Sequence, residues 1–294
     1  MIPPHLLPAY EECRRIQQHH GKTYYFSTLL FPKDVRPHVN ALYGFVRYPD
    51  ELVDNPVHAT IPERCRAVRQ FRMQTIQAHA NKSVENPILH AFGHTMRTMG
   101  IQLKDALDFL DAMESDLTIS RYKTYAELQK YMRGSASCVG RMMCPLLGVD
   151  DEKALTHAAQ LGEAMQVTNF LRDIKEDYAR GRIYMPLEDM ERFGVTEDHI
   201  KNGIVDDNWK AFMRFQIERN RHIYAEADKG LLSIPPTRRK AVACARVLYS
   251  DILTRIEKNQ YDVFNKRAAT TLSRKLFVAG SILFGMNHTR LAHD

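Results

Sequence analysis

The sequence predicts an all-α fold, and three observations support that class. Its 13 prolines are clustered, which leaves proline-free windows far longer than any strand, at 88–144, 146–185, 187–234 and 237–294. Apolar residues in these windows recur at intervals of three and four, the period of a helix with one buried face. Alternation of apolar and polar residues, which is typical of a half-buried strand, is nearly absent.

Short stretches rich in proline, glycine, asparagine and aspartate separate the expected helices. They lie at 31–34, 54–56, 85–87, 148–150, 206–208 and 234–237. A Thr or Asp is placed to cap several of the helices that follow. No repeat, low-complexity tract or polar linker divides the chain. We therefore expect one domain over residues 1–294, built from about ten helices.

Composition bounds the function. The chain has 294 residues, of which 44% are hydrophobic and 26% charged, so it can bury a large core and is neither disordered nor fibrous. A net charge of +6 suits an anionic small molecule, a membrane surface or nucleic acid. No basic patch is interleaved with aromatic residues, and we therefore expect no nucleic-acid partner.

Cysteine usage and terminal segments predict the compartment. Five widely spaced cysteines without a CxxC pair argue against a disulfide framework or a structural zinc site and favour the reducing cytoplasm. The N-terminus lacks the basic and apolar regions of a secretory signal. A charge-free run at 276–286 has 11 residues, whereas a membrane-spanning helix needs about 20. Monotopic contact with a membrane stays open.

Two acidic motifs have spacings that matter for chemistry. Asp50 and Asp54 are four residues apart, so they share a helix face with Arg47 on the same stripe. In the second motif Asp173 and Asp177 continue the face of Asn169, which Gln166 extends toward the N-terminus. Each motif alone is typical of a solvated helix face. Together they favour a magnesium diphosphate site, because magnesium takes oxygen ligands and shares them with substrate phosphates.

Basic residues accompany both motifs and could hold phosphate oxygens. His20, Lys22 and Thr23 precede the first motif, and Arg180 and Arg182 follow the second. Each basic segment alone can also be interpreted as a solvated loop that binds no phosphate. A Walker loop, a GxGxxG turn and a GxSxG elbow are all absent from the sequence. Metal ions and side chains are thus the expected phosphate ligands.

Four segments carry a resemblance to a known family. They are HGKTYYFSTLLFP, ALYGFVRYPDELVD, YMRGSASCVG and QVTNFLRDIKEDYARGRIYMP, in this order. They resemble the squalene and phytoene synthases, the head-to-head prenyl synthases of isoprenoid metabolism, and the likeness runs from about residue 10 to about residue 276. The resemblance implies an all-α terpenoid-synthase bundle around a central cavity.

The resemblance also implies roles for single residues. The metal ligands would be Asp50, Asp54, Asn169, Asp173 and Asp177. The diphosphate contacts would be His20, Lys22, Thr23, Arg47, Arg172, Tyr249 and Arg267, with Tyr249 counted among the catalytic residues together with the four aspartates. Tyr43, Tyr131, Gln166 and Tyr184 would face the cavity. Thr23 replaces the serine of many members but keeps the hydroxyl, and Tyr24 replaces a phenylalanine.

The implied reaction condenses two prenyl diphosphates. Three magnesium ions, or manganese in their place, would turn one diphosphate into a leaving group, and the allylic cation would join the second chain in a closed apolar cavity. The residues of the first two segments are most similar to those of bacterial phytoene synthases. These enzymes join two geranylgeranyl diphosphates through prephytoene diphosphate for carotenoid biosynthesis. Delivery of so apolar a product implies peripheral membrane contact, while the oligomeric state stays open.

Three alternatives remain open. A squalene or dehydrosqualene synthase would use two farnesyl diphosphates, and NADPH is required only for squalene. Relatives that act as non-catalytic assembly factors lose the aspartates, whereas all four are present here. A terpene cyclase would apply the same metal motifs to a single diphosphate.

Overall fold

Helices carry most of the chain in the computed structural model, which describes residues 2–54 and 60–286. The all-α class is confirmed: within these ranges the one pairing of extended residues is an isolated bridge between Arg121 and Ile183. The α-helices are α1 (Leu7–His20), α2 (Lys22–Thr28), α3 (Arg36–Asp54), α4 (Ile61–His79), α5 (Pro87–Met99), α6 (Leu103–Ser115), α7 (Tyr125–Met132), α8 (Cys138–Leu147), α9 (Glu152–Arg172), α10 (Ile174–Ala179), α11 (Leu187–Arg192), α12 (Glu197–Asn202), α13 (Asp207–Asp228), α14 (Pro236–Lys258) and α15 (Leu272–Leu283).

The expected helix boundaries are largely confirmed by the capping residues. Thr60 caps α4 in a capping box with Glu63, and side chains of Asp151 and Asp206 accept from the first turns of α9 and α13. A count of about ten helices was wrong, because the described residues contain fifteen. Glycines at 100, 194 and 203 with positive φ end helices inside the proline-free windows, which the pattern of prolines does not reveal.

A π-helical turn, Arg133–Ser137, connects α7 to α8, so the small residues from 134 to 140 do not lie on one regular helix. They do permit close packing. A Cβ at Gly140 would lie 2.1 Å from the carbonyl oxygen of Ala158 in α9, and one at Gly162 would lie 2.4 Å from that of Ala136. The backbones of α8 and α9 therefore approach as closely as glycine allows.

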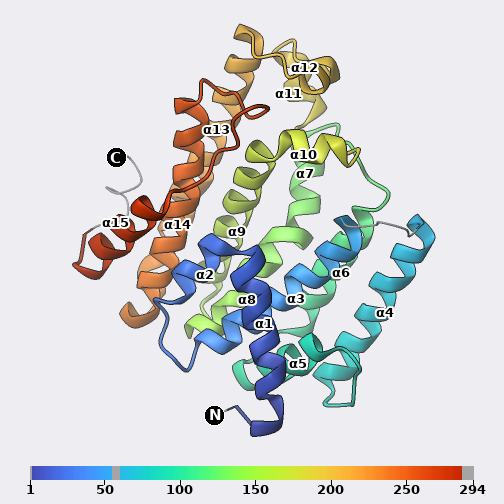
Figure 1. The fold of residues 1–294 in the computed structure, drawn as a ribbon, viewed down its shortest axis with the longest axis vertical. Helices are drawn as coiled ribbons and strands as arrows, with labels where there is room; N and C mark the ends of the chain where they lie inside the picture. The colour runs from blue at the N-terminus through green and yellow to red at the C-terminus, as the bar shows by residue number, and fades with distance from the viewer. Residues whose placement is uncertain (1, 55–59, 287–294) are drawn as a thin grey trace.

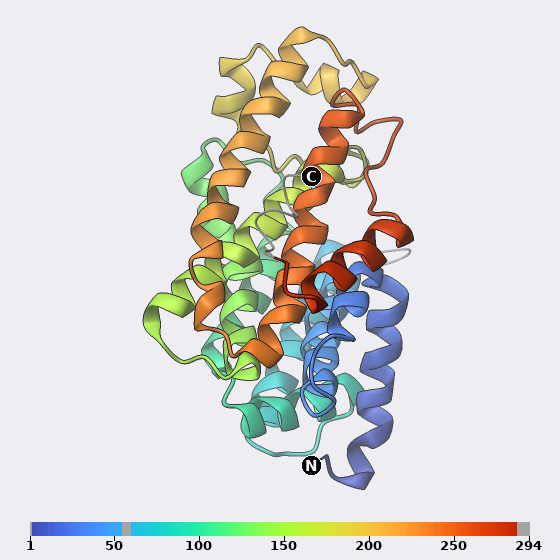
Figure 2. The ribbon, with the colours of Figure 1, turned by 90° about the vertical axis from the view of Figure 1, so that its left-hand side faces the viewer.

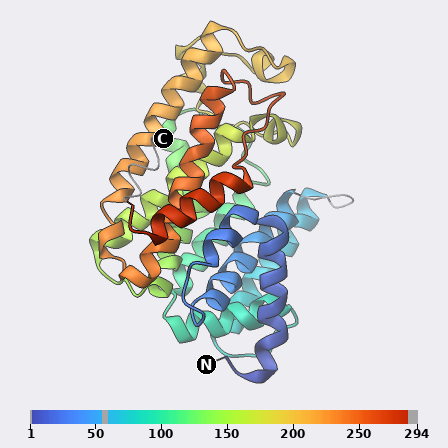
Figure 3. The same ribbon diagram turned by 60° about the vertical axis from the view of Figure 1, so that its left-hand side comes forward.

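The bundle is organised around α9, which packs against α8, α13 and α14 (Figure 1). On the other side α3 packs against α1, α5 and α6 (Figure 3), and α4 packs against α5 and α6 (Figure 1). One core cluster centres on Trp209 and Phe212, and a second on Phe45, whose ring stacks on Phe92 at 4.0 Å between centroids. The described residues pack into one helical bundle, and residues 1, 55–59 and 287–294 of the domain expected over 1–294 lie outside them.

No helix within the described ranges is both long enough and apolar enough to cross a lipid bilayer.

Candidate active site

A cavity of about 620 Å³ lies between the two halves of the bundle, with walls from α2, α3, α8, α9 and α14. It brings together all of the sixteen predicted site residues except Lys22 and Thr23. The lining members are His20, Tyr43, Arg47, Asp50, Asp54, Tyr131, Gln166, Asn169, Arg172, Asp173, Asp177, Tyr184, Tyr249 and Arg267. Lys22 is exposed in the first turn of α2, and Thr23 is half-buried next to it, so their contact with a diphosphate stays a prediction.

The first acidic motif forms the last two turns of α3, so Asp50 and Asp54 face the cavity together. Arg47, one turn earlier, donates to Asp50 at 2.5 Å and also to Glu51. The His20 ring lies 3.6 Å from the same Glu51 carboxylate. Burial and the neighbouring Asp54 charge raise the pKa of Asp50 to about 6. This side of the cavity therefore favours an added cation.

The spacing of the second motif predicted one continuous helix, but the structure interrupts this helix. Asp173 stands at the bend between α9 and α10 (φ −105°, ψ 18°), although its N–H still donates to the carbonyl of Asn169 at 2.9 Å. Because the helical bonding pattern nearly persists through the bend, Asp173 and Asp177 still line the cavity with Asn169. Arg172 and Arg267 both donate to the Asp173 carboxylate, at 2.5 and 2.7 Å.

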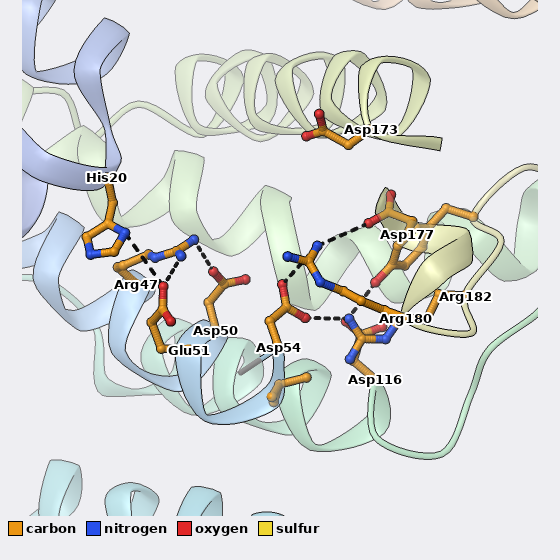
Figure 4. A network of polar contacts seen from close by, with 12 residues as sticks. His20, Arg47, Asp50, Glu51, Asp54, Asp116, Asp173, Asp177, Arg180 and Arg182 are labelled. Carbon is orange, nitrogen blue, oxygen red and sulfur yellow. Dashed lines mark hydrogen bonds and ion pairs between the residues drawn. The ribbon is translucent and has the colours of Figure 1, made fainter. Parts of the chain in front are cut away.

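Two arginines connect the motifs from the segment after α10, as Figure 4 shows. Arg180 lies 3.6 Å from Asp54 and 3.8 Å from Asp177. The buried Arg182 donates to Asp54 at 2.5 Å. The basic residues that follow the second motif therefore bind carboxylates of both motifs in this structure, across 128 positions of sequence in the case of Arg182.

Asp116 is a cavity residue that the sequence did not reveal. It follows α6 with 8% of its surface exposed, accepts a 2.8 Å hydrogen bond from the Tyr184 hydroxyl, and lies 3.7 Å from Arg182. Burial raises its pKa above the ordinary value. The rings of Tyr131 and Tyr184 stack nearby at 5.8 Å between centroids. An aspartate at a helix end, outside any motif, gives no sequence signal for such a role.

The residues present fit a hard divalent cation. The Oδ1 atom of Asn169 is buried without a hydrogen-bond partner, and so is Oδ1 of Asp116. Burial, and then the charge of Asp173, also raise the pKa of Asp177 well above its ordinary value, so this carboxylate lacks a sufficient counter-charge. In the described parts of the chain no three His, Cys, Asp or Glu side chains converge closely enough to hold an ion alone. Substrate oxygens would complete such a site.

Apolar side chains make up most of the remaining wall of the cavity, together with a few polar ones such as Gln17, Ser135 and His157. The lining residues of α9 run from Ala154 to Arg172, which is about 27 Å at 1.5 Å per residue. Met143 also lines it, whereas Met142 and Leu171 are buried in the core outside the lining. Near the acidic end the rings of Tyr24 and Tyr249 lie 4.6 Å apart between centroids. Burial raises the pKa of Tyr249, so its hydroxyl stays protonated and can donate.

Comparisons with known proteins agree with this geometry. The family model described as squalene/phytoene synthase matches residues 17–274. The chain is 37% identical to the 15-cis-phytoene synthase of Synechocystis sp., over 91% of this chain and 82% of that protein, and 36% identical to the chloroplastic phytoene synthase of Daucus carota, over 91% and 68%.

Two solved structures of squalene and dehydrosqualene synthases are also similar to this chain. A dehydrosqualene synthase has a TM-score of 0.88 at 27% identity and covers 95% of this chain and 97% of its own. A squalene synthase from Alicyclobacillus acidocaldarius has a TM-score of 0.81 at 28% identity, covering 89% and 97%.

Proposed function

The chain belongs to the squalene/phytoene synthase family, and from that premise we propose that it condenses two geranylgeranyl diphosphates head to head to phytoene. The observation that carries the proposal is that Asp50 and Asp54 share one cavity with Asp173 and Asp177, and that this acidic end continues into an apolar wall. The choice of substrate rests on relatives named as phytoene synthases at 34–37% identity.

The metal ligands in this proposal are Asp50, Asp54, Asn169, Asp173 and Asp177, around what we take to be three Mg²⁺ ions; Mn²⁺ accepts the same oxygen ligands. Bound Mg²⁺ would neutralise a prenyl diphosphate and make it a better leaving group. No carboxylate needs to act as a proton donor in this scheme.

The other residues orient substrate and exclude water. Arg47, Arg172 and Arg267 donate to Asp50 or Asp173 in this structure. With cations bound at those carboxylates, the guanidinium groups would be released to hold diphosphate oxygens. The Tyr249 hydroxyl can donate to a diphosphate oxygen. Apolar side chains on α8, α9 and α14 would surround the prenyl chains. They would exclude water, which would otherwise react with the carbocation.

A second candidate is a squalene or dehydrosqualene synthase, which the two structural neighbours at 27–28% identity favour. Incubation with labelled geranylgeranyl or farnesyl diphosphate, with and without NADPH, separates the two. We expect a C40 hydrocarbon from geranylgeranyl diphosphate that NADPH does not change. A C30 product from farnesyl diphosphate alone would overturn the substrate assignment, and a cyclic product from one diphosphate would indicate a terpene cyclase.

The metal ligands are tested by Asp50→Asn and Asp173→Asn. Each keeps the size of the side chain but removes the charge that magnesium needs, so we expect diphosphate release to fall at least 100-fold while the helical circular dichroism is unchanged. Asp207→Asn, at a fully exposed carboxylate in the first turn of α13, is the matched control and should keep full activity. Near-normal turnover of either cavity variant would contradict the site.

We also propose that the enzyme works at the periphery of a membrane, since its substrates are amphiphilic and its product is a hydrocarbon.

A further inference from the structure

Large apolar side chains are concentrated on the outside of α15 and in the turn that follows it. Of the thirteen exposed large hydrophobic residues in the described ranges, six lie between positions 272 and 286. These six, here called the outer α15 face, are Leu272, Leu276, Phe277, Leu283, Phe284 and Met286. Phe284 has 93% of its surface exposed. Apolar patches of this kind on a soluble surface mark interaction sites.

The helix has apolar residues on both of its sides. Val278, Ala279 and Ile282 are buried against α14, where Phe26 and Leu30 also pack. A helix that lies on a protein surface in water normally presents polar side chains outward. Figure 2 shows α15 lying across the outer side of α14, and the six side chains of the outer α15 face are exposed among the described residues.

Three lysines border this face without acidic partners, whereas Arg274, the other basic residue of α15, pairs with Asp251. Lys275 lies on α15 itself, and the charge of Lys22 on α2 adds to burial in lowering its pKa. Lys240 lies near the other end of the helix, with its Nζ 3.4 Å from the carbonyl oxygen of Leu283. Among the described residues none of these three lysines forms a salt bridge. The border is therefore complementary to an anionic surface.

The outer α15 face is separated from the cavity by one layer of helices. α15 packs on α14 and α2, and both of these line the cavity, α14 with Ala245 and Tyr249 and α2 with Tyr24 and Ser27. A surface that rests on α15 would thus be close to the chamber that holds the prenyl chains.

We propose that the outer α15 face docks onto a phospholipid bilayer that contains anionic lipids, with the apolar side chains in the acyl boundary and the lysines at the headgroups. A second copy of the chain is a poorer occupant. A stable interface takes about 20–30 residues from each partner, whereas the outer α15 face has six apolar residues. The benefit for substrate and product transfer rests on the proposed function, whereas the docking itself does not.

Flotation with vesicles tests the docking in the absence of substrate. We expect the full chain to float with vesicles of phosphatidylglycerol and phosphatidylcholine, and the bound fraction to fall at least fivefold for Leu276→Gln/Phe284→Gln. Met73→Gln, at an apolar position on α4 that is about as exposed as Leu276, is the control and should float like the wild type. Equal flotation of the α15 variant, or no flotation of the wild type, would overturn the proposal.

Three further measurements locate the contact. In Phe284→Trp the new fluorophore should shift to the blue on adding vesicles, whereas the native Trp209 is fully buried and should not respond. Lys240→Gln/Lys275→Gln should bind anionic vesicles more weakly and lose the preference over pure phosphatidylcholine. A concentration-dependent dimer in sedimentation, abolished by Leu276→Gln/Phe284→Gln, would instead assign the face to a second copy.

Failure of the docking is distinguishable from failure of the proposed function. Hydrocarbon formation is measured in detergent micelles, where Leu276→Gln/Phe284→Gln should turn over like the wild type. Vesicle binding without a C40 product would contradict the proposed function alone, and a C40 product without vesicle binding would contradict the docking alone.

Discussion

Single arginines determine how closely the cavity carboxylates can approach one another. Arg182 is the most buried example: its guanidinium lies between Asp54 and Asp116, with both carboxylates largely screened from water. Without it Asp54 would keep Arg180, 3.6 Å away, but the buried Asp116 would lose its ion pair with Arg182. The resulting repulsion between the two carboxylates would favour the unfolded chain or a raised pKa. The residue thus supports both the stability of the protein and the placement of a proposed metal ligand.

Arg182→Gln should accordingly lower the free energy of unfolding by about 3–5 kcal/mol, the range for removing one partner of a buried ion pair. Urea denaturation at pH 7 measures the change. Arg69→Gln is the matched control, because Arg69 pairs with Glu114 at an exposed surface site and its loss should have little effect. Similar midpoints for Arg182→Gln and Arg69→Gln would show that water or another cation compensates the buried carboxylates.

At the scale of elements, the crossing of α8 and α9 sets the width of the cavity. Both helices line it, and the glycines at 140 and 162 allow their backbones to touch. Small residues at such a crossing can either make room for substrate or let helices pack closely. The structure shows the close packing, and both glycines also border the cavity.

Gly140→Ala should therefore destabilise the protein by about 1–3 kcal/mol, since the added methyl group overlaps the Ala158 carbonyl and the helices must separate. Gly280→Ala on α15 is the opposite control: nothing lies within 4 Å of the new Cβ, and alanine in place of glycine stabilises a helix by up to about 1 kcal/mol. Thermal unfolding should therefore show a lower melting temperature for Gly140→Ala and an unchanged or higher one for Gly280→Ala. Equal changes in melting temperature would show that helix propensity, and not the contact between α8 and α9, determines the effect of Gly140→Ala.

At the scale of the whole molecule, a buried polar cluster connects three helices at the end of the bundle far from α11 and α12. Tyr10 of α1 lies 2.8 Å from Thr95 of α5, and Nδ1 of His38 of α3 lies 3.0 Å from the same Thr95 hydroxyl. Burial lowers the pKa of His38 to about 4, and the nearby His94 contributes in the same direction. The folded chain therefore holds a neutral imidazole there.

The stability of the whole chain should fall as the pH drops from about 6.5 to about 4. The unfolded chain takes up a proton on His38 near pH 6.5, whereas the folded chain does not until about pH 4, so up to about 3 kcal/mol is lost across this window. Urea denaturation at several pH values measures the slope. It should be smaller in His38→Gln and unchanged in His222→Gln, at an exposed position of α13; an unchanged slope in His38→Gln would assign it to other groups.

Local patterns in the sequence determined the helical class, several helix boundaries and the two acidic motifs, because helix period, capping and the i, i+4 spacing are properties of neighbouring positions. Only the family resemblance predicted the cavity residues Tyr43, Tyr131, Arg172, Tyr184, Tyr249 and Arg267. The bend at Asp173 escaped prediction, since it keeps the spacing of four while leaving the helix.

Only the tertiary structure decided which distant charges meet. Arg182 and Asp54 are 128 positions apart, and Asp116 enters the cavity from the end of α6, outside both predicted motifs. The outer α15 face could likewise not be recognised from its sequence, because both sides of the helix are apolar and only packing on α14 distinguishes the buried side from the exposed one. Such pairings depend on how whole helices pack, which no local spacing records.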